Sequence, residues 1–248
     1  MDYHGACFAF QPILKMDSHS VSAYKALIRG KEGESAQQVL ESLSNEDLFQ
    51  FDLDSKSWAL ETAAKLGVTC NLALSLLPQT LLFVPGAVNQ LLDRIYLYGF
   101  KPGQVVIELT EQAFSNETNS SDDINSLIRA IHQLQGAGVR IALSAYGASP
   151  ERPSFQTLLA AVKPIQLKID RSITTGVDKD KPHQSTVGRA LEICHRLGIP
   201  VVAEGVQTLK ELRWLNKVGI NEVQGFLFAK PLLEGLPTVD WNDAKTAR

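Results

Sequence analysis

The sequence alternates between two kinds of segment along most of its length, and this alternation restricts the possible folds more than any other feature. Eight short runs of apolar and β-branched residues are typical of buried strands, and longer amphipathic segments with helical periodicity separate most of them. The strand-like runs are CFAFQPIL, SAYKALI, VTCNLALSL, QVVIELT, VRIALSAY, IQLKI, PVVAEGV and EVQGFLFA. Apolar strands that alternate with helices indicate a parallel sheet covered on its faces.

The number of these units fits a closed barrel. Eight strand and helix units within 248 residues match the size of a (β/α)8 barrel. Several helical segments end at a glycine that is expected to form a left-handed C-cap, namely Gly67, Gly99, Gly198 and Gly219. Only the short connection KMDSHSV separates the first two runs, so these strands are expected to form an antiparallel hairpin. No long linker or internal repeat divides the chain, which predicts one domain.

Composition excludes several classes of protein. Twenty-four basic and 27 acidic residues give a formal net charge of −3, which provides no field to attract nucleic acid or an acidic membrane. Three scattered cysteines without a CxxC pair argue against a disulfide framework, and five histidines without HExxH spacing argue against zinc. No run of 18 apolar residues is present. We therefore expect a cytoplasmic protein with no membrane contact and no direct contact with nucleic acid.

Charged residues follow aliphatic residues near the ends of three predicted strands. Glu108, Lys168 and Glu204 occupy this position in VVIELTE, IQLKID and PVVAEGV. The carboxyl ends of parallel barrel strands open at one mouth, where residues from different strands converge. One charge at a strand end is ordinary, because loops are solvated, but three in equivalent places predict a shared site. Other polar residues near strand ends are Lys25, Arg29, Ser75, Glu111, Ser144, Asp170 and Gln224.

Six segments occur in the order and spacing of one known family, from Phe8 to Leu232: FAFQPIL, AYKALIRG, VVIELTEQ, QLKIDRSI, VVAEGVQT and VQGFLFAKPL. By these motifs the chain resembles the EAL domain family, bacterial phosphodiesterases that open cyclic di-GMP to linear pGpG. It resembles in particular the stand-alone inactive members of enterobacteria. The resemblance implies an α/β fold, a TIM-like (β/α)8 barrel with an antiparallel first strand, as a single EAL-like domain over residues 1–248. In active members two divalent cations activate a water molecule, and a lysine helps to orient it.

Part of the family's catalytic pattern is retained. Glu108 matches a metal-binding glutamate, Lys168 matches the lysine near the attacking water, and Glu204 matches the glutamate of the AEG motif. Glu111 is also retained and resembles a structural carboxylate behind the metal ligands. These matches imply that the wall of the family's active site persists.

The rest of the pattern is lost. Lys25 replaces the glutamate that names the family, and Ser75 aligns with its metal-binding asparagine, although Asn71 leaves this alignment open. Ser144 and Ala145 replace a pair of aspartates, and the longer loop GASPERPSF follows them. Hard cations need several oxygen ligands, and here an ammonium stands among the few that remain. We predict no metal, no cofactor and no phosphodiesterase activity, so that the retained positions are vestigial.

Lys25 invites two interpretations. A Lys25 to Glu108 ion pair would substitute for the metal by neutralising a carboxylate at the barrel mouth. The alternative is a drifted residue without a role, because many ion pairs near a surface contribute little to stability.

An inactive domain acts only by contact with another molecule. From the resemblance we predict a regulator that works by protein-protein interaction in the control of motility versus sessility, for example by binding and inhibiting a flagellar transcription regulator. The alternative is a receptor that binds cyclic di-GMP without hydrolysis, and residual phosphodiesterase activity is the least favoured. Arg29 suits a phosphate, although a structural salt bridge would also explain it. The candidate nucleotide contacts are Gln11, Arg29, Lys168, Glu204 and Gln224.

Overall fold

The computed structural model describes residues 6–110, 121–146 and 153–241. Its strands are β1 (Cys7–Lys15), β2 (Ser20–Arg29), β3 (Asn71–Leu76), β4 (Val105–Thr110), β5 (Arg140–Tyr146), β6 (Gln166–Ile169), β7 (Val201–Glu204), β8 (Glu222–Gln224) and β9 (Leu232–Leu233). Strands β2 to β8 pair in order and in parallel, and β1 closes the barrel by pairing antiparallel with both β8 and β2. The predicted TIM-like barrel and its antiparallel first strand are therefore confirmed.

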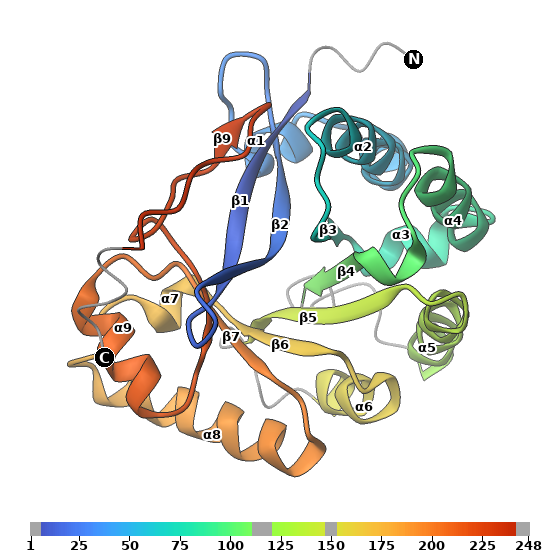
Figure 1. Cartoon of the computed structure of the whole chain (residues 1–248). Coiled ribbons are helices and arrows are strands. Elements are labelled where there is room, and N and C mark those ends of the chain that lie inside the picture. The colour runs from blue at the N-terminus through green and yellow to red at the C-terminus, as the bar shows by residue number, and fades with distance from the viewer. Residues whose placement is uncertain (1–5, 111–120, 147–152, 242–248) are drawn as a thin grey trace.

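The helices lie around the outside of the barrel (Figure 1). They are α1 (Ala36–Glu41), α2 (Asn45–Lys65), α3 (Pro78–Phe83), α4 (Ala87–Leu97), α5 (Ser121–Gly136), α6 (Pro153–Val162), α7 (Arg171–Thr174), α8 (Lys181–Leu197) and α9 (Leu209–Lys217), with a 3-10 turn η1 (Pro102–Gln104). Helices α3 and α7 were not expected, because six and four residues are too few to show a period. No helix among the described residues is long and apolar enough to cross a membrane.

Four predicted helix ends are confirmed by backbone conformation. Gly67, Gly99, Gly198 and Gly219 have φ angles of 70°, 78°, 68° and 91°. This left-handed region is strained for residues with a Cβ atom, which explains glycine at these stops.

Side chains inside the barrel form layers. A middle layer is apolar and contains Ile13, Ala23, Ala73, Val106, Ala142 and Val202. Beneath it, at the amino ends of the strands, Gln166 donates to Glu222 at 2.7 Å. Above it, at the carboxyl ends, the buried polar residues Glu108, Lys168 and Gln224 form a third layer. The apolar layer thus closes the barrel below a polar mouth.

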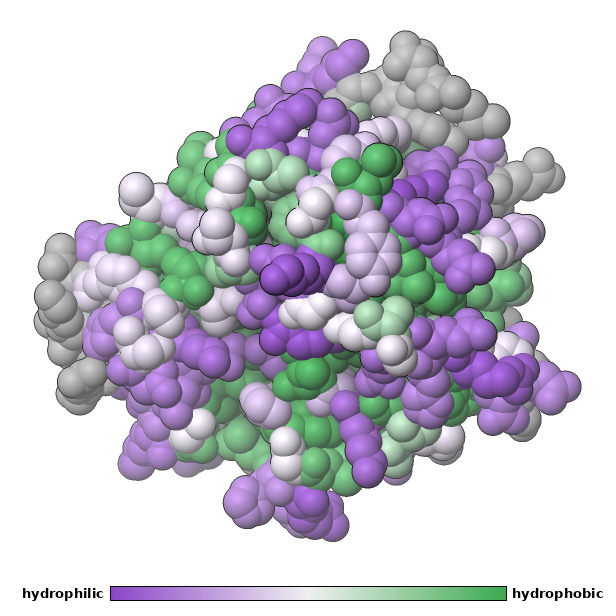
Figure 2. Space-filling view, turned by 45° about the vertical axis from the view of Figure 1, so that its right-hand side comes forward, coloured by the Kyte–Doolittle hydropathy of each residue, from purple (hydrophilic) through white to green (hydrophobic). Residues whose placement is uncertain are grey.

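The face shown in Figure 2 carries hydrophobic residues in small separate groups among hydrophilic ones. Such scattering is normal for a protein surface in water. On this face, therefore, no single broad apolar patch indicates an obligate interface.

Candidate functional site

Four charged side chains meet at the barrel mouth. Lys25 on β2 places its Nζ 2.8 Å from Oε2 of Glu108 and 2.9 Å from Oε1 of Glu204. Lys168 on β6 places its Nζ 2.8 Å from the same Glu204 oxygen and also pairs with Oε1 of Glu108. We refer to these four residues as the Lys/Glu cluster. Each ammonium lies between both carboxylates, so the cluster is neutral when all four groups are charged.

The Lys/Glu cluster is largely shielded from water. Lys168 and Glu108 are 0% and 1% exposed, and the side chains of Lys25 and Glu204 are 12% and 16% exposed. An unpaired charge at such depth would cost several kcal/mol, so each lysine is needed to keep the glutamates ionised in the folded state. The predicted pair between Lys25 and Glu108 is therefore present, and Lys25 also neutralises Glu204.

Burial and charge act in opposite directions on the ionisation of the cluster. Burial alone would lower the pKa of Lys25, but Glu108 and then Glu204 outweigh it and raise this pKa above its usual range. Burial alone would raise the pKa of Glu204, but Lys168 and then Lys25 outweigh it and hold this pKa well below its usual range. Both groups stay charged across the ordinary pH range.

These shifts predict how folding stability depends on pH. The contribution of Glu204 is complete above its unfolded pKa of about 4.3 and is lost as pH falls below that value. The contribution of Lys25 is complete below about pH 10 and is lost at higher pH. Between pH 6 and pH 3, wild type should lose on the order of 2 kcal/mol more unfolding free energy than Glu204→Gln. Urea denaturation of both proteins at the two pH values measures this, and equal losses would contradict it.

Two glutamines extend the cluster across the closing strands. Gln224 on β8 accepts from Lys168 at 3.4 Å and donates to Oε1 of Gln11 at 2.8 Å. Gln11 on β1 then donates to the carbonyl oxygen of Ala229 at 3.0 Å. The structure therefore brings both predicted nucleotide contacts together with the cluster, where their amides already bond within the protein.

The two candidates for the position of the family's asparagine, Asn71 and Ser75, lie at different levels of the barrel. Asn71 begins β3, donates to the carbonyl oxygen of Ser22 at 2.8 Å and accepts from Arg140. It thus belongs to the amino ends of the strands, on the far side of the apolar layer. Ser75 instead lies in register with Glu108, beside the cluster. The alignment of Ser75 with the family's asparagine remains a prediction, and the place of Ser75 beside the cluster is consistent with it.

The other predicted site residues lie only partly within the described residues. Ser144 on β5 is buried and lies in register with Thr110 of β4. Ala145 also belongs to β5, but its side chain is outside the described residues. Glu111, like the loop that follows β5, is outside them as well.

The described residues do not fit a pair of divalent cations. Glu108 and Glu204 both have an ammonium within 2.9 Å, which a cation would have to displace. Ser75 and Ser144 add hydroxyls where stronger oxygen ligands would be needed. In the described ranges, His, Cys, Asp and Glu residues nowhere gather as three or more around a possible metal position.

A cavity of about 200 Å³ opens beside the cluster. Its polar lining includes Gln11, Lys25, Arg29, Arg171, Glu204 and Gln224. Arg29 donates to the carbonyl oxygen of Ile28 at 2.7 Å, and burial lowers its pKa. No carboxylate among the described residues forms an ion pair with Arg29, so the structural salt bridge considered for it is not found there. Arg171 was not predicted, although its place two residues after the end of β6 was a usable signal.

Comparison with known proteins identifies the family of this chain. The model of the EAL domain matches residues 4–231. The blue light- and temperature-regulated antirepressor BluF of Escherichia coli (strain K12) is 32% identical over 239 residues, which cover 96% of this chain and 57% of BluF. The chain thus spans little more than half the length of this relative.

Solved structures agree with the fold. Klebsiella pneumoniae BlrP1, in its calcium and cy-diGMP complex at pH 8.0, has a TM-score of 0.85 and 34% identity, over 94% of this chain and 57% of BlrP1. A standalone versatile EAL protein from Vibrio cholerae O395, in its c-di-GMP bound form, has a TM-score of 0.86 and 28% identity, over 98% of this chain and 99% of that one.

Proposed function

Because this chain belongs to the EAL domain family, we propose that it is a degenerate member: a single EAL-like domain that regulates another protein by binding it and does not hydrolyse cyclic di-GMP. The observation that carries the proposal is Lys25, whose ammonium is 2.8 Å from Glu108 and 2.9 Å from Glu204. These carboxylates match positions that face the reaction centre in active members. Because both carboxylates are paired with ammonium groups, a cation could bind them only by displacing these ion pairs.

The regulatory part of the proposal draws on the relative BluF, which is named an antirepressor. By analogy, the partner of this chain would be a transcription regulator. Two kinds are candidates: a repressor, which the name of BluF suggests, and the flagellar regulator expected from the sequence motifs. Both proposals require a protein contact and neither requires an enzymatic activity.

The absence of hydrolysis is directly testable. With cyclic di-GMP and excess Mg²⁺ or Mn²⁺, we expect no pGpG above the background of a protein-free reaction, because nothing activates the attacking water. Chromatography of the nucleotides measures the product, with an active EAL phosphodiesterase run in parallel as the positive control. Turnover that rises with protein concentration and is lost in Glu108→Gln would contradict the proposal.

The partner is tested separately. Tagged chain is used to isolate proteins from cells of its source, and each regulator found is purified and mixed with the chain. We expect a stoichiometric complex by size-exclusion chromatography and calorimetry. If no transcription regulator forms such a complex, the regulatory proposal fails.

A cyclic di-GMP receptor is the second candidate. Arg29 favours it, since this guanidinium lines the cavity beside the cluster and has no described carboxylate partner. Calorimetry with cyclic di-GMP tests it, with Arg29→Ala as the matched variant. Micromolar binding of cyclic di-GMP that this substitution abolishes would support a receptor function. If wild type shows no heat of binding, the receptor function is wrong.

A further inference from the structure

Helix α1 is weakly attached to the barrel. It has six residues, none of them buried. In the described structure, every hydrogen bond of residues 31–43 stays within residues 30–43, including the capping box of Ser35 with Gln38 and the bond from Gln37 to Glu41 at 2.7 Å. Only side-chain packing and the two chain connections therefore hold α1 in place.

Cavities flank α1 on two sides. One, of about 480 Å³, lies between Val39 and Leu43 and the buried ring of Phe51. The other, of about 530 Å³, lies between Leu40 and a floor that includes Phe8 and Leu76. Each volume falls in the range of about 300–1,000 Å³ typical of ligand pockets. Val39, Leu40 and Leu43 are only half-buried, so apolar surface faces both cavities.

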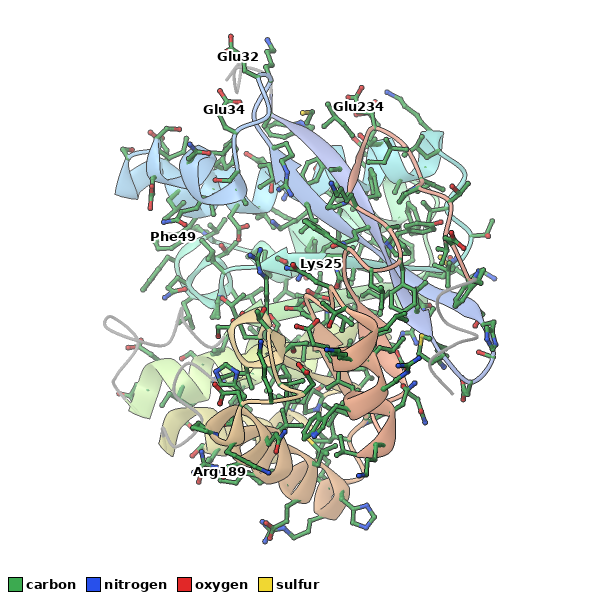
Figure 3. All side chains as sticks on the ribbon, turned by 90° about the vertical axis from the view of Figure 1, so that its left-hand side faces the viewer. Lys25, Glu32, Glu34, Phe49, Arg189 and Glu234 are labelled. Carbon is green, nitrogen blue, oxygen red and sulfur yellow. The ribbon has the colours of Figure 1, made fainter. Side chains whose placement is uncertain are left out.

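The surroundings of α1 are acidic. Residues 30–47 contain one lysine against five acidic residues, a net charge of −4, whereas the whole chain carries −3. Figure 3 shows Glu32 and Glu34 together at one edge of the molecule, with Phe49 on the same side. The lysine inside the larger cavity, Lys56, is buried and paired with Asp52 at 2.6 Å. A ligand approaching this face therefore meets apolar cavities with a negatively charged rim.

We propose that this α1 surface (residues 30–47 with the two cavities) is the docking site for a basic amphipathic helix of the protein partner; the proposal rests on the function proposed above. Apolar residues of such a helix, spaced three or four apart, would enter the cavities beside α1, and its Lys and Arg residues would face the acidic rim. Transcription regulators carry basic segments because they bind phosphate groups of DNA. Docking here would engage the cations that such a regulator uses on DNA.

The test uses the full chain and two designed 16-residue peptides as probes. The peptides share one apolar face, and their polar face is lysine in one and glutamate in the other. By fluorescence anisotropy we expect the lysine peptide to bind at least tenfold more tightly, and the difference to shrink at high salt. Equal affinities, or no binding of the lysine peptide, would overturn the proposal.

Variants locate the site. Glu32→Lys with Glu41→Lys brings the net charge of residues 30–47 to zero and should abolish the preference for the lysine peptide. Leu40→Asp with Leu43→Asp should lower the affinity of the chain for both peptides at least tenfold. The control is Glu192→Lys, which changes the charge by two units on α8, where the glutamate side chain is 70% exposed, and it should leave the affinity of both peptides unchanged. Circular dichroism verifies that each variant is folded, and unchanged binding in the α1 variants would refute the site.

The two proposals fail separately. If the chain binds a transcription regulator equally well with and without the α1 substitutions, the docking site is wrong and the regulatory function stands. If the lysine peptide binds at α1 but no regulator forms a complex, the regulatory function is wrong and the surface stands.

Discussion

Lys168→Met should lower the unfolding free energy by about 3–5 kcal/mol, which is the usual cost of removing one partner from a buried ion pair. Lys168 is fully buried and its ammonium contacts both Glu108 and Glu204. Methionine fills similar space without charge, so the cluster would keep two carboxylates and only one ammonium. Guanidinium chloride denaturation at pH 7 measures the difference from wild type.

A second substitution separates charge from packing. Lys168→Met combined with Glu108→Gln restores neutrality around Lys25 and Glu204, so it should recover at least half of the lost free energy. The control is Lys65→Met, which removes an ammonium whose side chain is 71% exposed and should leave stability almost unchanged. A loss below about 1 kcal/mol in Lys168→Met would show that the cluster does not stabilise the fold.

Lys25→Glu should destabilise the protein by on the order of 3 kcal/mol at pH 7.5 and make it responsive to acid and to divalent cations. The substitution restores the family's glutamate but leaves three carboxylates around Lys168. Repulsion raises the pKa of at least one of them in the folded state, so stability should rise as pH falls from 7.5 to 5. Mn²⁺ should raise the melting temperature of this variant, because a cation that binds only the folded state stabilises it.

Lys25→Gln is the matched control, since it removes the ammonium without adding a carboxylate. It should respond to Mn²⁺ less than Lys25→Glu, and wild type should not respond at all. Thermal unfolding with and without metal at both pH values distinguishes the three proteins. A wild type stabilised by Mn²⁺ as strongly as Lys25→Glu would mean that Lys25 does not block cation binding.

Strand order could be read from the sequence, and with it the convergence of Glu108, Lys168 and Glu204. Each follows an aliphatic run, and a parallel barrel brings such positions to one mouth. The sequence did not predict that each lysine would bridge both glutamates. That detail depends on strand tilt and on how far each side chain reaches, which residue order does not specify.

Three other features were also beyond sequence reasoning. The bond between Gln224 and Gln11 joins residues 213 positions apart, and it follows from how β1 closes the barrel beside β8. Strand β9 has only two residues, too few for any alternation to be recognised. The segment SAQQVLESL has the apolar spacing of a helix with a buried face, but none of the residues of α1 is buried. Packing against the barrel, not the pattern itself, decides that outcome.

Two cavities lie near the carboxyl ends of the barrel strands, and Lys25 lines the smaller one. Gln11, Arg29 and Gln224 also line this cavity of about 200 Å³, and Ser75 and Thr110 line the cavity of about 530 Å³. The Lys25 ammonium beside the smaller cavity is already paired with both Glu108 and Glu204. An anionic ligand of the smaller cavity would therefore meet a lysine whose charge two carboxylates already neutralise.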